Sequence, residues 1–144
     1  MAFRLEKTPI DTAAVQAALA DPRAGAFCGF DGRVRNSNAG REVLSLEYEA
    51  HGPLAEKEGE RILAEARAKF RITGVECVHR TGRLLPGDIA VYAAAAAAHR
   101  EDAFGACRYV IDEVKARVPI WKKEHYQGGS AEWINSAERG PPAK

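Results

Sequence analysis

Two lysines seven residues apart flank an apolar corner in the segment VKARVPIWKKEHY, residues 114–126. Lys115 falls in the last turns of an expected helix that Pro119 ends, and Lys122 follows Trp121, which is expected to anchor the corner in the core. Lys115 lies at the rim of the apolar stripe, so its stem can rest on the core while its amine reaches a cleft. A lysine beside apolar walls and another cation can act as a nucleophile or base. The alternative is a solvated helix end with salt-bridged lysines.

Two further cationic clusters stand at the ends of expected elements. In GRVRN, strand alternation predicts that Arg33 and Arg35 share one face, where paired guanidinium groups suit a phosphate or a carboxylate. An exposed strand edge protected by charge is the alternative. In AHRED, His99 and Arg100 stand where a strand leads into a helix N-terminus, which attracts anions. A helix cap with a surface arginine is the alternative there.

The composition excludes several classes of function. The chain has 144 residues and a formal net charge of +1, so an anion site must come from local clusters. No run of 18 apolar residues predicts a membrane span, and MAFRLEKTPID lacks the apolar stretch of a signal peptide. Cys28, Cys77 and Cys107 are isolated, which favours buried reduced thiols in a cytoplasmic protein. No metal-ligand spacing, glycine-rich phosphate loop or nucleophile elbow occurs, so neither a metal nor a cofactor is predicted.

The periodicity of the chain predicts a mixture of strands and helices, an α+β class. Strands are expected over 25–34, 42–50, 72–80 and 89–98. Helices are expected from a cap at Asp11 to about Ala20, from Pro53 to about 70, and from about 101 to 117. The run IAVYAAAAAA is ambiguous, because alanine favours helices whereas its isoleucine, valine and tyrosine favour a strand. The chain from about 125 is expected to be irregular, with a single domain over 1–140 and a disordered tail over 141–144.

Five segments, in order, resemble the catalytic (large) subunit of molybdopterin synthase: GFDGRVRN, LEYEAHGPLAE, VHRTGRLLPGD, AAAHRE and VKARVPIWKKE. The similarity covers about residues 25 to 126. The last segment is the most specific, because its lysines, internal proline and W-K-K-E run are not general features of helix ends. The resemblance implies an α/β-hammerhead type of fold with a mixed or antiparallel sheet and flanking helices.

The resemblance also implies a reaction and its partners. Sulfur is transferred from the C-terminal Gly-Gly thiocarboxylate of a small ubiquitin-like carrier subunit to cyclic pyranopterin monophosphate. Two rounds of transfer give the dithiolene of molybdopterin, within the biosynthesis of the molybdenum cofactor. The catalytic subunit is implied to form a homodimer that binds one carrier at each end, which makes a heterotetramer.

Carried over position by position, the resemblance assigns ten residues to the site. Lys115 and Lys122 match the catalytic lysines. The substrate-binding positions are Phe30, Arg33, Val34, Arg35, His99, Arg100, Lys123 and Glu124. Arg139 in EWINSAERG is left out, because its register is shifted relative to the family. Two other classes remain open: a non-catalytic regulator that binds the carrier, and a small nucleotide- or RNA-binding protein.

Overall fold

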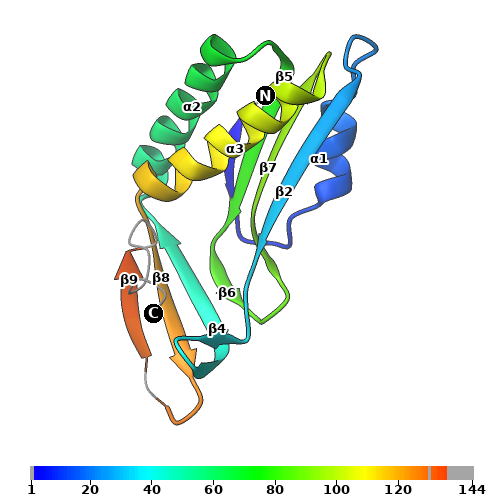
Figure 1. Cartoon of the computed structure of the whole chain (residues 1–144). Helices are drawn as coiled ribbons and strands as arrows, with labels where there is room; N and C mark the ends of the chain where they lie inside the picture. The colour runs from blue at the N-terminus through cyan, green and yellow to red at the C-terminus, as the bar shows by residue number, and fades with distance from the viewer. Residues whose placement is uncertain (1, 130, 136–144) are drawn as a thin grey trace.

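The computed structural model describes residues 2–129 and 131–135, which form three helices and nine strands in two sheets (Figure 1). The first sheet has the order β1 (Phe3–Glu6), β5 (Ile72–Arg80), β7 (Ile89–Ala97), β2 (Ala26–Arg33). β1 runs parallel to β5, and the other neighbouring strands are antiparallel. The expected α+β class, with a mixed sheet and flanking helices, is confirmed.

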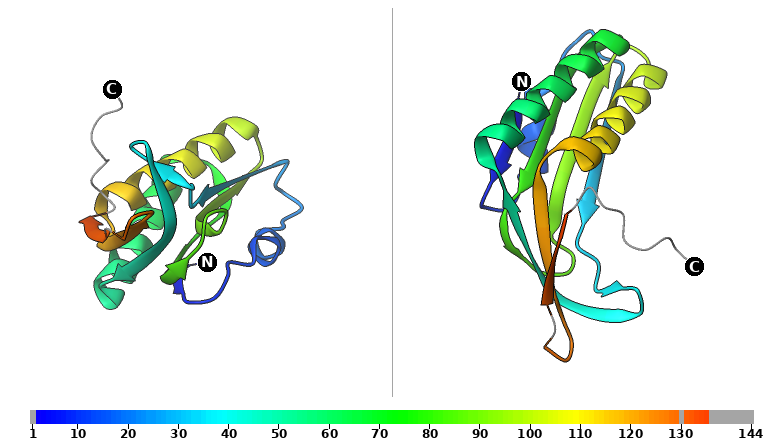
Figure 2. Two further views of the ribbon diagram at one scale, coloured as in Figure 1. Left: turned by 90° about the horizontal axis from the view of Figure 1, so that it is seen from below. Right: turned by 90° about the vertical axis from the view of Figure 1, so that its left-hand side faces the viewer.

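Helices cover both faces of this first sheet (Figure 2). α2 (Gly52–Lys69) and α3 (Arg100–Arg117) pack on one face, where their apolar residues meet Ala93 and Ala95 of β7. α1 (Thr12–Ala18) packs on the other face against Ala94 and Ala96. The expected cap of α1 is present, because Asp11 accepts a hydrogen bond from the Ala14 amide at 3.0 Å. This helix is two residues shorter than expected.

The alanine-rich run forms the strand β7, as predicted. It lies between β5 and β2, and its residues from Ala93 to Ala97 are at most 1% exposed. A strand buried on both faces reads as a continuous apolar run rather than an alternation. Alanine side chains here allow helices to approach the sheet closely from either side.

A second, antiparallel sheet continues below the first (Figure 1). Its strands follow the order β3 (Ser37–Asn38), β4 (Arg41–Ala50), β8 (Ile120–Tyr126), β9 (Ala131–Asn135), and β6 (Gly82–Leu84) also pairs with β4. A small apolar cluster lies on its inner side, made of Val34, Val43, Leu46, Leu84, Ala90 and Tyr126. This cluster joins the second sheet to the ends of β2 and β7.

The expected irregular structure after residue 125 is wrong for the described part of that region. β8 continues to Tyr126, and β9 pairs with it antiparallel from Ala131↔His125 to Asn135↔Trp121. The strands β1, β3, β6 and β8 were not predicted either. β1, β3 and β6 have two to four residues, which show no usable alternation, and the segment of β8 was expected only to return from the helix. The predicted tail over 141–144 and Arg139 lie outside the described residues, and the single domain over 1–140 stays a prediction. None of the described helices has the length and apolar character needed to cross a membrane.

Candidate active site

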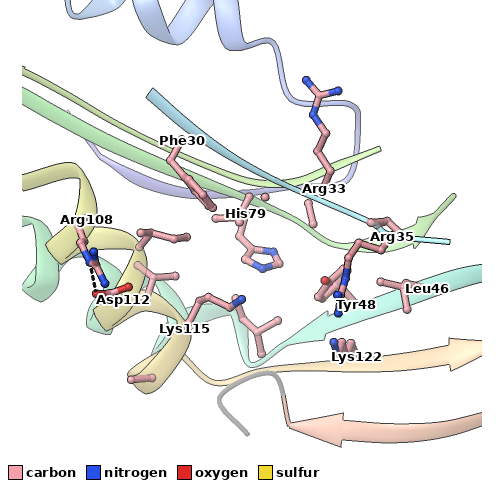
Figure 3. A pocket seen from close by; sticks show the side chains of 18 of the residues that line it. Phe30, Arg33, Arg35, Leu46, Tyr48, His79, Arg108, Asp112, Lys115 and Lys122 are labelled. Atoms are coloured by element: carbon pink, nitrogen blue, oxygen red, sulfur yellow. Dashed lines mark hydrogen bonds and ion pairs between the residues drawn. The ribbon is translucent and has the colours of Figure 1, made fainter. Parts of the chain in front are cut away.

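A cavity of about 960 Å³ lies between α3 and the second sheet. Its walls come from β2, β4, β8 and α3, with His79 of β5 and the first residues of β7. Figure 3 shows Lys115, Lys122, Arg35 and His79 around it. Of the ten residues proposed from sequence, seven line this cavity: Phe30, Arg33, Val34, Arg35, Lys115, Lys122 and Glu124.

The apolar corner brings the two lysines together, as the sequence predicted. Lys115 lies in the last turn of α3, and Lys122 lies on β8 after the chain has turned back. Val118 and Ile120 are each 1% exposed and fix the corner in the core. Trp121 does not anchor the corner as expected, since it is 37% exposed. Alternation on β8 explains this, because Trp121 must face away when Ile120 faces inward.

Glu124 is a buried anion of the site, with 2% of its surface exposed. Burial by itself raises the pKa of this carboxyl group. Hydrogen bonds from Tyr126 and Asn38, together with the charge of Lys122, outweigh burial and hold the pKa below its ordinary value. The Lys122 amine lies 3.3 Å from Glu124 Oε1. The carboxylate therefore compensates one of the cations that face the cavity.

His79 lines the cavity as a buried neutral imidazole, 7% exposed. Burial lowers the pKa of His79 to about 4, and the charge of Lys115 acts in the same direction. Its Nδ1 lies 2.9 Å from the Arg80 carbonyl oxygen. Because a carbonyl oxygen can only accept, Nδ1 carries the proton, and Nε2 of the neutral ring is a hydrogen-bond acceptor. The imidazole therefore adds no positive charge to the wall beside Lys115.

Tyr48 stands against His79 with its ring edge-on, at 5.0 Å between centroids and an interplanar angle of 70°. Burial, and then the negative charge of Glu124, raise the pKa of Tyr48 to about 12. The phenol is neutral at ordinary pH. The cavity thus offers a neutral hydroxyl and a neutral imidazole between cationic groups.

The two arginines of GRVRN do not share a face, contrary to the sequence expectation. Arg35 extends beside Tyr48 towards Lys122, whereas the Arg33 side chain points away from Lys122 (Figure 3). Arg33 forms an ion pair with Asp31 at 2.8 Å, and 60% of its side chain is exposed. A register shift between Gly32 and Arg33 interrupts the alternation on which the expectation depended.

Three of the proposed residues lie away from the cavity of this chain. Lys123 is on the opposite face of β8, with its amine 5.5 Å from the centroid of the Trp133 ring. His99 is the N-cap of α3 and Arg100 is its first residue, and both are exposed. Fifteen helical residues place Arg100 about 22 Å along the helix from Lys115.

Sequence reasoning missed His79, Tyr48 and Asn38 as residues of the site. A histidine within the apolar strand ITGVECVHR was a usable signal, because burying it requires a hydrogen-bond partner. Tyr48 follows the inward alternation of β4 and looked like an ordinary core residue. Nothing local marks Asn38, whose contacts are far away in the sequence.

The cysteines and potential metal ligands add no reactive group. Cys28 and Cys107 line the cavity as free thiols, and Cys77 is buried nearby. Burial, and then the neighbouring Cys28, raise the pKa of Cys107 to about 12, which keeps it protonated. Among the described residues, no group of three or more His, Cys, Asp or Glu side chains could hold a metal ion. The cations therefore dominate the chemistry, which suits binding of an anionic substrate and stabilisation of developing negative charge.

Comparison with known proteins identifies the family. A family profile described as MoaE protein matches residues 5–117. A rice protein (Oryza sativa subsp. indica) named molybdopterin synthase catalytic subunit is 48% identical over 118 residues, which is 82% of this chain and 61% of the rice protein. The chain thus spans less than two thirds of that relative's length.

Solved structures agree with this assignment. The crystal structure of molybdopterin synthase from Staphylococcus aureus matches with a TM-score of 0.86 and 38% identity, over 91% of this chain and 95% of that one. A Helicobacter pylori structure, described as a complex of subunits 1 and 2 of molybdopterin-converting factor, shares the fold with a TM-score of 0.75 at 22% identity, over 97% and 93% of the two chains. The chain belongs to the MoaE protein family, the family that the sequence motifs indicated.

Proposed function

We propose that this chain is a catalytic subunit of molybdopterin synthase. It transfers sulfur from the thiocarboxylate of a small ubiquitin-like carrier to cyclic pyranopterin monophosphate, in two rounds. The observation that carries the proposal is the convergence of Lys115, Lys122 and Arg35, from three distant segments, on one cavity. Substrate and carrier tail are both anionic, and such a cluster can hold them together despite their mutual repulsion.

The proposed transfer has two bond-making stages. The thiocarboxylate sulfur attacks a carbon of the pterin side chain, and a carbon–oxygen bond breaks as the carbon–sulfur bond forms. Water then attacks the acyl carbon, the acyl–sulfur bond breaks, and the carrier leaves as a carboxylate. The sulfur stays on the pterin, and the proton released by hydrolysis balances the charge of the departed oxygen. A second carrier repeats the sequence for the second sulfur.

The cationic residues divide this work. Lys115 stabilises negative charge that develops during the transfer or acts as the acid and base, and Lys122 holds the phosphate or the carrier tail. Arg35 supports binding with a guanidinium group that suits a phosphate. Part of the cavity wall is buried and apolar, including Val91, Ile111 and Val114, and charges act more strongly beside such a wall than in open solvent.

We also propose that His99 and Arg100 serve the site of a second copy of the chain. Neither residue lines the cavity described above, and Arg100 lies about 22 Å along α3 from Lys115, whereas a homodimer can bring both residues to its partner's cavity. The complex described for the Helicobacter pylori structure supports a carrier subunit as the further partner. Three free thiols support a reducing compartment, and we place the reaction in the cytoplasm.

The first experiment mixes this chain with a thiocarboxylated carrier and cyclic pyranopterin monophosphate, and follows molybdopterin as its fluorescent oxidised derivative. Lys115→Ala is expected to abolish turnover while the fold survives. Lys69→Ala is the matched control, because Lys69 lies in the last turn of α2 with an exposed side chain. Normal turnover by Lys115→Ala contradicts the catalytic assignment. A chain that binds the carrier but never turns over is instead the non-catalytic regulator.

The second experiment tests the shared site by complementation. Lys115→Ala and His99→Ala are each expected to be impaired alone, and a mixture that exchanges subunits is expected to regain activity. The mixed dimer contains one cavity with both groups intact, so activity approaching a quarter of the unaltered level is expected at equal mixing. Failure to regain activity after demonstrated subunit exchange contradicts the second-copy assignment.

A further inference from the structure

Glu124 is held by a residue from a distant part of the chain. The amide nitrogen of Asn38 lies 3.0 Å from Oε1 and 2.9 Å from Oε2 of the carboxylate. The Tyr126 hydroxyl donates to Oε2 at 2.7 Å, and the Lys122 amine lies 3.3 Å from Oε1. Lys122 and Tyr126 follow from the alternation of β8 around Glu124, whereas Asn38 is 86 residues away in sequence.

A tight hairpin delivers this amide. Asn38 of β3 pairs with Arg41 of β4, and Ala39 and Gly40 form the two-residue turn between them. Both turn residues have positive φ values, 52° for Ala39 and 79° for Gly40. Two-residue hairpin turns with both φ values positive fit the twist of the strands, although an alanine adopts this conformation at a cost. The turn therefore fixes where Asn38 points.

The same hairpin also contacts Tyr126, the second hydrogen-bond donor to Glu124. The Arg41 guanidinium lies over the Tyr126 ring, 3.8 Å from its centroid. Asn38 thus acts on Glu124 directly, and Arg41 packs on the tyrosine whose hydroxyl acts on it. Asn38 contacts both oxygens and Tyr126 contacts Oε2, and in this orientation of the carboxylate Lys122 lies beside Oε1. A carboxylate without these donors can rotate and take the amine with it.

We propose that Asn38 is a positioning residue, which orients Glu124 so that its Oε1 directs the Lys122 ammonium into the cavity. Asn38 itself need not touch the reacting atoms, and its effect passes through Glu124 to Lys122. This inference rests on the proposed function for its kinetic consequences, but its structural part concerns only these three side chains.

A double-mutant cycle tests whether Asn38 acts through Lys122. Asn38→Ala is expected to lower kcat/KM for sulfur transfer at least tenfold, since small displacements of a positioned group cost rate strongly. In a Lys122→Ala background, kcat/KM measured under single-turnover conditions is expected to fall less than twofold further when Asn38→Ala is added. Asn36→Ala is the matched control, because Asn36 is an exposed asparagine of the same connection. Losses that multiply in the double variant overturn the proposal, because Asn38 then acts independently of Lys122.

A second measurement needs no catalytic activity. Lysines are dimethylated with ¹³C-formaldehyde, and the Lys122 signal is assigned by its absence in Lys122→Arg. Asn38→Ala is expected to move this signal towards those of exposed lysines, while Asn36→Ala leaves it in place. An unmoved Lys122 signal in Asn38→Ala overturns the inference. If the unaltered chain fails to turn over, the proposed function fails, and this second measurement still decides the role of Asn38.

Discussion

Removing one hydroxyl group from Tyr126 measures how far the buried carboxylate of Glu124 depends on its donors. The hydroxyl donates to Oε2 at 2.7 Å, and Glu124 is 2% exposed, so water has little access with which to replace the lost donor. Hydrogen bonds to charged groups contribute about 1.5–3 kcal/mol. Phenylalanine keeps the ring and its contact with Arg41, so the hydroxyl is the group that changes. Tyr126→Phe is expected to lower the free energy of unfolding by about 2 kcal/mol, roughly thirtyfold in the unfolding equilibrium.

A second tyrosine supplies the matched control. The Tyr109 hydroxyl donates to Glu65 Oε1 at 2.6 Å, but the Glu65 side chain is 32% exposed on the helix surface. Water and the guanidinium of Arg117 remain available to Glu65 when the hydroxyl is removed. Tyr109→Phe is therefore expected to change stability much less than Tyr126→Phe, although both bonds have nearly the same length.

The assay is urea unfolding followed by far-ultraviolet circular dichroism at pH 7. Both variants are expected to have the same slope of unfolding free energy against urea concentration as the unaltered chain, so that a shifted midpoint reports a change in stability alone. Equal losses in the two variants refute the reasoning, because burial of Glu124 then adds nothing to the bond. A loss in Tyr126→Phe that vanishes in a Glu124→Gln background locates the effect at the carboxylate.

Two further predictions concern acid stability and packing. Burial lowers the pKa of His79 from an ordinary 6.5 to about 4, so the unfolded chain binds this proton first and stability falls as the pH drops between these values. The stabilising contribution of the neutral His79 is complete above about pH 6.5. His79→Gln is therefore expected to reduce the loss of stability between pH 7 and pH 5, measured by urea unfolding at each pH. An unchanged dependence of stability on pH assigns that loss to other groups. A methyl group at Gly59 would overlap the Phe3 ring, so Gly59→Ala is expected to cost about 1–3 kcal/mol. Gly52→Ala at the open start of α2 is the control in thermal unfolding, and equal melting temperatures contradict the packing argument.

The sequence was informative wherever the relevant physics is local. Helical periodicity and Pro119 set the end of α3 and the return of the chain after it. They were sufficient to predict that Lys115 and Lys122 flank an apolar corner, whereas the strand β8 that carries Lys122 was not predicted. The predicted strand at the alanine-rich run also held, because its first residues are typical of strands and a helix there would have merged with the following helix.

Features that depend on long-range pairing were beyond sequence reasoning. The register shift after Gly32 turns Arg33 away, and no residue type in GRVRN signals such a shift. β9 is ordered through its ladder with β8, so its own segment shows little strand character. The contact between Asn38 and Glu124 joins residues that only the second sheet brings together. Each of these depends on partners that are distant in the chain.

The alanine row of β7 has a consequence for the height of the Lys115 amine above the cavity floor. Ala93 and Ala95 have no exposed surface, and α3 rests on them through residues such as Cys107 and Val110. Their methyl groups act as a spacer whose thickness sets the separation of helix and sheet. A single larger side chain in this low-complexity segment would lift the helix and carry the amine with it. The least distinctive stretch of the chain therefore tolerates little change in side-chain volume.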